Sequence, residues 1–275
     1  MPATSCKICA SPRLKDLYLI HGYQISQCRD CGFGQVDITA EELAAFYDQS
    51  YFKGEKARFA QEEDEAIRPS HRYWLEHYLA AFDRTQPLRI LDIGPGLGAQ
   101  FGEYLRATYP HLAYEAVEIS AFAAERLRLR GFTIHHGRVV DPHILDACRS
   151  RFDLIVGTEV IEHDPEPHAF VAAIAAMLKP GGRCAFTTGN LRGIVARTQG
   201  ERWYYLDPPA HVSYYTPAAA RKVFAAQGLT NIDVWKIGFN YITLKLRTKL
   251  PGILTLADLI SLPTGMSLSA QRPLD

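Results

Sequence analysis

From Leu88 onward, the chain alternates between short apolar segments and stretches with helical spacing. Five of the apolar segments have the length of strands: residues 89–93, 113–118, 132–136, 152–157 and 183–188. Near-continuous apolar strands are typical of a sheet buried on both faces, and helical crossovers make its neighbouring strands parallel. The alternation therefore predicts an α/β fold with a doubly wound sheet.

Two more strands are expected at the end of this region. A helix over residues 216–227 precedes strands at 232–239 and 242–247, and their short connection predicts a hairpin. We therefore expect the α/β domain to cover residues 88–248 and residues 249–275 to form a C-terminal tail.

A glycine-rich loop, Gly94-Pro95-Gly96-Leu97-Gly98, follows the first strand. Glycines allow the backbone to turn sharply and to approach a ligand closely. The dinucleotide fingerprint G-x-G-x-x-G is not completed, because Ala99 and Gln100 follow Gly98. This spacing disfavours a nicotinamide or flavin enzyme.

The second strand ends in Glu118. A carboxylate at this point holds the ribose hydroxyls in Rossmann-like nucleoside sites. The alternative is that Glu118 caps a helix or is a solvated charge.

Near the N-terminus, Cys6, Cys9, Cys28 and Cys31 form two Cys-x-x-Cys pairs. Their spacing is that of a four-thiolate zinc ribbon, which we expect over residues 1–37. So short a segment cannot bury a core, and zinc binding would supply the missing folding free energy. Four thiolates complete the tetrahedron, so this zinc would be structural. Residues 38–87 are expected to form a helical linker or lid.

Charge and hydropathy favour a cytoplasmic protein. Thirty basic residues balance thirty acidic ones, so no global field attracts nucleic acid or an anionic membrane. The N-terminus does not have the pattern of a signal peptide, and no apolar run is long enough to span a bilayer.

From about residue 88 to 240, the chain resembles class I S-adenosylmethionine-dependent methyltransferases. The resemblance rests on the glycine loop, Glu118, the segment 152–163 and Leu178-Lys179-Pro180-Gly181-Gly182. It implies a Rossmann-like seven-stranded sheet whose last strand is antiparallel, with S-adenosylmethionine as the methyl donor. The cysteine ribbon resembles the zinc-binding cap of bacterial biosynthetic methyltransferases.

The same resemblance implies a donor site at the strand ends. The glycines would face the methionine and ribose, Glu118 would hold the ribose, and Gly137 and Arg138 would lie beside the adenine. The family commonly carries an acidic residue where Arg138 stands. The full set of expected donor-binding residues is Asp92, Gly94, Pro95, Gly96, Gly98, Glu118, Ile119, Gly137, Arg138 and Glu159.

The fourth strand ends in Glu159-x-x-Glu162-His163, and His211 follows later. This pattern resembles the divalent-metal set of small-RNA 3′-end methyltransferases and the Glu-x-x-Glu-His element of ubiquinone-pathway O-methyltransferases. Three interpretations stay open. The four residues bind Mg²⁺ or a similar ion that lowers the pKa of an acceptor hydroxyl. His163 or His211 is instead a metal-free catalytic base. In the third, the glutamates cap a helix and the histidines make local hydrogen bonds.

The insertion at 189–215 contains arginines and aromatic residues, including Arg192, Arg197 and Trp203. They could bind a phosphate, a carboxylate or a ring, or they could simply pack the insertion onto the domain. We expect a methyltransferase acting on a hydroxyl or another nucleophile of a small-molecule biosynthetic intermediate. The alternatives are an RNA methyltransferase whose ribbon contacts RNA, and a non-catalytic partner protein that binds S-adenosylmethionine.

Overall fold

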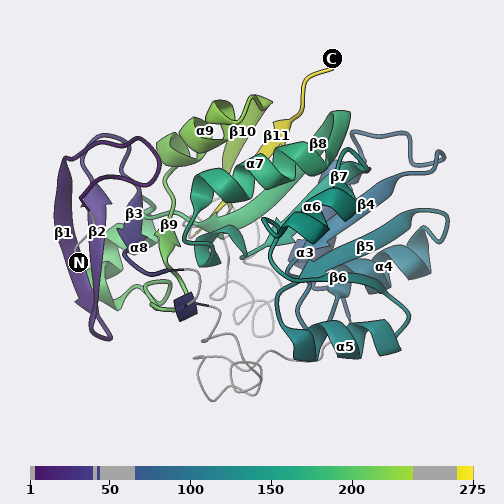
Figure 1. The fold of residues 1–275 in the computed structure, drawn as a ribbon, viewed down its shortest axis with the longest axis horizontal. Coiled ribbons are helices and arrows are strands. Elements are labelled where there is room, and N and C mark those ends of the chain that lie inside the picture. Colours follow the sequence, from purple (N-terminus) through teal and green to yellow (C-terminus); the bar gives the residue numbers. More distant parts are fainter. Residues whose placement is uncertain (1–3, 40–41, 44–65, 238–264, 275) are drawn as a thin grey trace, which may run out of the picture.

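The computed structural model describes residues 4–39, 42–43, 66–237 and 265–274. These residues form a four-stranded sheet near the N-terminus and a seven-stranded sheet with helices on both faces (Figure 1). None of the helices in these ranges is long and apolar enough to cross a membrane.

Five strands of the larger sheet are parallel. Across the sheet they run in the order β6 (Thr133–His136), β5 (Ala113–Glu118), β4 (Arg89–Ile93), β7 (Phe152–Thr158) and β8 (Leu178–Gly189). From β4 the chain first builds the sheet toward β6 and then returns to add β7 on the other side. The strand order therefore reverses between β4 and β7, as in Rossmann-like folds.

The sheet is completed by β11 (Gly265–Gln271), which is antiparallel to both of its neighbours, β8 and β10 (Thr230–Ile237). This arrangement confirms the expected seven-stranded sheet with an antiparallel last strand. The strand expected at 242–247 lies outside the described residues. Because β11 lies in the segment expected to be a tail, the domain extends to Gln271 rather than ending at 248.

The sequence of β11 explains why it was missed. Met266 and Leu268 are buried, but the alternating serines resemble a loop. Ser267 is also fully buried, and its hydroxyl oxygen lies 2.7 Å from both Trp74 Nε1 and the Tyr78 hydroxyl. These hydrogen bonds from helix α3 (Pro69–Leu79) allow a polar side chain inside the sheet.

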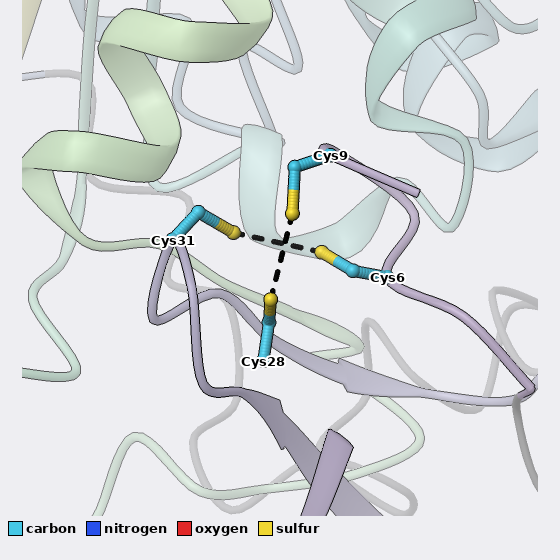
Figure 2. A group of neighbouring side chains, drawn as sticks. All are labelled: Cys6, Cys9, Cys28 and Cys31. Carbon is cyan, nitrogen blue, oxygen red and sulfur yellow. Dashed lines mark hydrogen bonds between the residues drawn. The ribbon is translucent and has the colours of Figure 1, made fainter. Parts of the chain in front are cut away.

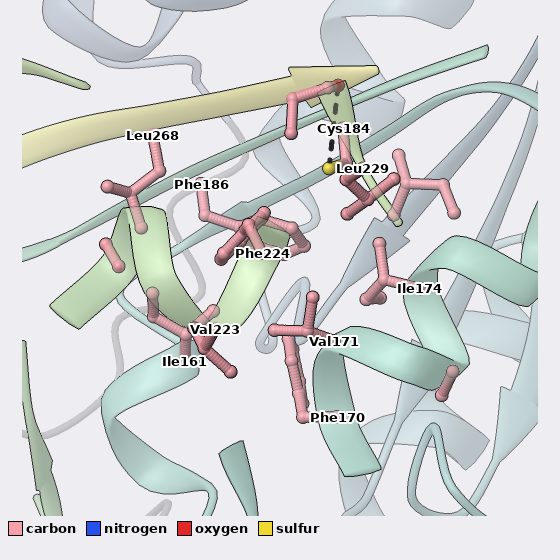
Figure 3. Close-up of a cluster of buried hydrophobic side chains, with 14 of the residues drawn as sticks. Ile161, Phe170, Val171, Ile174, Cys184, Phe186, Val223, Phe224, Leu229 and Leu268 are labelled. Atoms are coloured by element: carbon pink, nitrogen blue, oxygen red, sulfur yellow. Dashed lines mark hydrogen bonds between the residues drawn. The ribbon is translucent and has the colours of Figure 1, made fainter. Parts of the chain in front are cut away.

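Helices cover both faces of the sheet. One face carries α6 (Pro142–Cys148), α7 (Pro167–Met177) and α9 (Pro217–Ala226), and the cluster between α7, α9 and the strands is shown in Figure 3. The other clusters involve α3, α4 (Gln100–Thr108) and α5 (Ala121–Leu129). Successive residues of a strand pack on opposite faces, because Cys184 and Phe186 join the first cluster and Ala185 the α3 cluster.

The N-terminal sheet is not independent of the domain. Its strands β1 (Leu14–Ile20), β2 (Tyr23–Cys28) and β3 (Gly34–Val36) are extended by β9 (Ser213–Tyr214), which comes from the 189–215 insertion. The insertion also contains α8 (Ile194–Gln199) and the 3₁₀ turn η2 (Gly200–Arg202). Ribbon and insertion side chains share one apolar core that includes Ile25, Val36, Trp203 and Val212. The ribbon therefore gains its core from the insertion.

Candidate active site

A cavity of about 780 Å³, including its open mouth, lies at the carboxyl ends of β4, β5 and β7. This is the point where the strand order reverses, and ligands of open α/β sheets bind there. Eight of the residues expected at the donor or catalytic site line the cavity: Gly94, Gly96, Glu118, Ile119, Gly137, Arg138, Glu159 and His163. The sequence thus identified most of this wall.

Four expected residues do not line the cavity as described: Asp92, Pro95, Gly98 and His211. Asp92 is buried, and its carboxylate accepts a hydrogen bond from the Tyr114 hydroxyl at 2.8 Å. Burial raises the pKa of Asp92 to about 7. The Gly98 carbonyl accepts a hydrogen bond from Arg130 at 2.9 Å. Asp92 and Gly98 therefore make contacts within the protein rather than at the cavity wall.

The glycine loop requires its glycines at two positions. Gly94 has φ of 67° and Gly96 has φ of 61°, values that other residues rarely adopt. A Cβ atom at Gly94 would lie 3.0 Å from the Val160 side chain. The backbone of this loop is consequently exposed to the cavity without a side chain in between.

Glu118 lies on the cavity wall at the end of β5, with only 3% of its surface exposed. Its carboxylate accepts a hydrogen bond from the Ser120 N–H at 2.8 Å. Burial raises the pKa of Glu118 to about 7, although backbone hydrogen bonds from Ser120, Gly96 and Ile119 oppose the shift. Glu118 thus connects the glycine loop to the loop after β5.

Arg138 has acidic partners that the sequence did not indicate. Its guanidinium lies 3.2 Å from Asp164 and 3.0 Å from Glu166. Asp164 also lines the cavity, together with Val139 and Phe170. The position of Asp164, directly after His163, was the only local signal that could have suggested it. Asp164 therefore contributes a carboxylate to the cavity wall that is paired with Arg138.

Glu159 and Glu162 have different surroundings. Glu159 lines the cavity, and it accepts a hydrogen bond from the Thr187 hydroxyl at 3.1 Å. Glu162 is completely buried, and its Oε2 accepts a hydrogen bond from the Thr188 hydroxyl at 2.8 Å. Its other oxygen, Oε1, has no hydrogen-bond partner among the described residues. Burial raises the pKa of Glu159 to about 8 and that of Glu162 to about 7.

His163 and His211 are oriented by backbone carbonyls. His163 Nδ1 lies 2.7 Å from the Ala210 oxygen, and His211 Nδ1 lies 2.7 Å from the Tyr205 oxygen. A carbonyl can only accept, so both rings donate through Nδ1 and in their neutral form carry the lone pair on Nε2. Burial lowers the pKa of both histidines, that of His211 to about 3.

Glu162, His163 and His211 form a compact group. Each offers an oxygen or nitrogen atom within 4.8 Å of the others, and the two imidazole rings are 4.8 Å apart. Glu159 is not a member of this group. The structure therefore brings together three of the four residues in the Glu-x-x-Glu-His and His pattern.

A second cluster lies in the ribbon, where four sulfur atoms point toward a common centre (Figure 2): Cys6, Cys9, Cys28 and Cys31. The sulfurs of Cys6 and Cys31 are 3.5 Å apart, as are those of Cys9 and Cys28, and none forms a disulfide. Thiolates around a tetrahedral zinc ion would be about 3.8 Å apart. The cluster therefore fits a four-thiolate zinc site.

The model of one protein family, described as a methyltransferase domain, matches residues 59–234, well over half of the chain. The chain belongs to this methyltransferase family. It is a class I S-adenosylmethionine-dependent methyltransferase, as the sequence motifs indicated.

Curated relatives of this methyltransferase include ubiquinone biosynthesis O-methyltransferases. The enzyme of Idiomarina loihiensis is 28% identical over 162 residues, which is 55% of this chain and 65% of the relative. The enzyme of Cereibacter sphaeroides is 29% identical over 185 residues, 61% of this chain and 73% of the relative. The similarity thus leaves a substantial part of both proteins unmatched.

Solved structures confirm the fold of the methyltransferase domain. An S-adenosylmethionine-dependent methyltransferase from Archaeoglobus fulgidus superposes with a TM-score of 0.55 at 17% identity, covering 82% of this chain and all of that one. Another from Mesorhizobium loti gives 0.51 at 17% identity, covering 72% of this chain and 96% of that one. At this identity the similarity concerns the fold alone.

The geometry of the cysteine cluster predicts about one tightly held zinc ion per chain. Cys28→Ser should abolish its retention during dialysis, because three thiolates no longer complete the tetrahedron. Cys148→Ser and Cys184→Ser are matched controls, since both thiols are buried outside the cluster. Elemental analysis measures the zinc, and equal zinc in Cys28→Ser and wild type would refute the assignment.

The position of Glu118 predicts a loss of S-adenosylmethionine affinity in Glu118→Ala. A carboxylate that holds two ribose hydroxyls contributes charge-assisted hydrogen bonds, so we expect binding to weaken by roughly 10- to 100-fold. Glu125→Ala, on the exposed side of α5, should bind as wild type does. Isothermal titration calorimetry measures both, and unchanged affinity in Glu118→Ala would disprove the role.

Proposed function

We propose that this methyltransferase transfers the methyl group of S-adenosylmethionine to a hydroxyl of a small-molecule biosynthetic intermediate. The observation that carries the proposal is the closeness of the cavity to the histidine group, since His163 belongs to both. The O-methyltransferase names of the curated relatives support a hydroxyl acceptor.

The cavity supplies the contacts that the donor needs. Gly94 and Gly96 let the backbone approach the methionine portion, and Glu118 accepts the ribose hydroxyl protons. Ile119, Val139 and other apolar wall residues offer surfaces for the adenine. The sulfonium already activates the methyl group, so the protein's main tasks are to align the acceptor and to exclude water.

We further propose that Glu162, His163 and His211 hold a divalent ion. Glu162 Oε1 is a buried oxygen that accepts no hydrogen bond in the described part of the chain and lies 4.0 Å from His163 Nε2. A buried carboxylate oxygen of this kind is stabilised by a cation or a proton. The carbonyls of Ala210 and Tyr205 each accept a hydrogen bond from one histidine ring, and such bonds orient the histidines that bind metal ions in other proteins. When bound, the ion would lower the pKa of the acceptor hydroxyl.

The ligand types indicate which ions fit. Two imidazoles and one carboxylate suit manganese, iron, cobalt or zinc better than magnesium, which prefers oxygen ligands. Glu159 lies outside this group and lines the cavity, which supports a role for it in binding the donor. In the ribbon, we propose that the four cysteines hold a structural zinc ion.

The ion site predicts that Mn²⁺ binds to the zinc-loaded protein and that His211→Ala or Glu162→Gln weakens this binding by about 100-fold or more, because each removes one of three ligands. His111→Ala, in an exposed loop, is the matched control. Electron paramagnetic resonance reports free and bound Mn²⁺. If both ligand variants bind Mn²⁺ as wild type does, the histidine group does not hold an ion.

The activity is tested with a donor that carries a deuterated methyl group. Incubated with fractionated metabolite pools, the protein should form S-adenosylhomocysteine and a product with one labelled methyl ether, detected by mass spectrometry. Glu118→Ala should reduce both products together. Labelled methyl found only on nitrogen or carbon would reject a hydroxyl acceptor, and labelled RNA would identify the alternative substrate class.

A further inference from the structure

We propose that a second cavity, between the ribbon and the 189–215 insertion, binds the phosphate group of a small molecule. The cavity encloses about 950 Å³ including its open mouth, and no residue lines both it and the donor cavity. Strands β1 and β2 form one side, and α8, η2 and the loop before α8 form the other. This inference concerns a site outside the proposed methyl-transfer chemistry and does not depend on it.

The charge of the cavity is entirely positive. Lys15, Arg192 and Arg197 line it, and none of the described lining residues is acidic. None of these three cations forms an ion pair with a carboxylate in the part of the chain that the structure describes. In a chain of balanced charge, three cations with no carboxylate partner among the described residues create a local field around the cavity that favours an anion.

The position of Arg192 depends on a glycine in the ribbon. Gly32, beside the zinc-site residue Cys31, has φ of 78°, and a Cβ atom there would lie 2.9 Å from both Nε and Cζ of Arg192. The absence of a side chain at Gly32 therefore allows the guanidinium to lie against the ribbon backbone. This close approach positions Arg192 at the cavity by packing against Gly32 rather than by pairing with a described carboxylate.

Trp203, another residue that lines the cavity, has a buried indole nitrogen. Its side chain is 2% exposed, and Nε1 has no hydrogen-bond partner among the described residues. An indole nitrogen can only donate, so a buried one without an acceptor is unfavourable. A shift of the ring toward the cavity would let an oxygen of a bound anion accept this hydrogen bond.

Three cations and one neutral donor match a phosphate group better than a single carboxylate, which carries less charge and fewer oxygens. Leu17, Tyr18 and Leu206 also line the cavity and offer apolar surface to the rest of the ligand. A hollow with mixed polar and apolar walls suits a small molecule, whereas RNA requires a continuous basic track. The geometry thus points to a phosphorylated small molecule.

A ligand bound in this cavity would also affect the histidine group, through the contacts of Trp203. The Trp203 ring stacks on Tyr205, with centroids 5.0 Å apart and planes 21° apart. The Tyr205 carbonyl accepts the hydrogen bond from His211, and its hydroxyl lies 2.9 Å from the Thr188 hydroxyl, which donates to Glu162. A ligand that shifts Trp203 would therefore change the hydrogen-bonding surroundings of His211 and Glu162.

The test follows the indole N–H of Trp203 by NMR in full-length, zinc-loaded protein labelled with ¹⁵N-tryptophan. Trp203→Phe assigns its signal among the three tryptophans. Inorganic phosphate and pyrophosphate should shift this signal saturably. Arg192→Gln and Arg197→Gln should each weaken the binding at least tenfold, and Arg202→Gln, which does not line the cavity, should leave it unchanged.

Three results would overturn the proposal. One is that neither inorganic phosphate nor pyrophosphate shifts the Trp203 indole signal saturably. Another is an equal affinity in wild type, Arg192→Gln and Arg197→Gln, with circular dichroism showing that all three are folded. The last is a shift that depends on another kind of ligand. An equal shift with acetate would identify a carboxylate as the ligand, and a shift with an RNA oligonucleotide alone would identify a nucleic acid.

Discussion

The backbone pairing of β3 with β9 is the contact on which the position of the histidine group depends. Gly34 pairs with Tyr214 and Gln35 with Ser213, so the ribbon extends into the segment directly after His211. The next hydrogen bonds continue the connection. The Val36 N–H donates to the Val212 carbonyl, and the Val212 N–H donates to the backbone carbonyl of Glu162. An uninterrupted backbone path thus joins the ribbon to the strand end that carries the histidine group.

This path gives the ribbon a role beyond its own folding. A loop as long as 189–215 is ordinarily mobile, and a site that depends on such a loop loses precision. Here β9 adds the loop to a sheet, and the Thr216 hydroxyl donates to the Cys31 carbonyl at 2.8 Å. Whatever stabilises the cysteine cluster also stabilises the position of His211. A metal in the ribbon would therefore support the site without taking part in the chemistry.

The cavity wall at the carboxyl ends of the strands was largely predictable from the sequence because its signals are local. Strands β4 and β5 have the expected bounds, since their apolar runs are buried on both faces. Once the strands are known, the topology places Gly94, Glu118 and Glu159 at one edge of the sheet. The exceptions have physical causes. Asp92 lies within β4 and is hydrogen-bonded to Tyr114, and the buried Ser267 of β11 is hydrogen-bonded by the distant helix α3.

The surroundings of His211 and the second cavity could not be predicted in the same way, because residues far apart in the chain build them. No local sequence pattern predicts a two-residue strand such as β9. Likewise, the residues around Gly32 do not indicate that Arg192 will lie against it. The same separation allows the two halves of the site to change independently. Substitutions in the ribbon or the insertion can reshape the surface around His211 while the glycine loop keeps its conformation, because separate segments of the chain build the two.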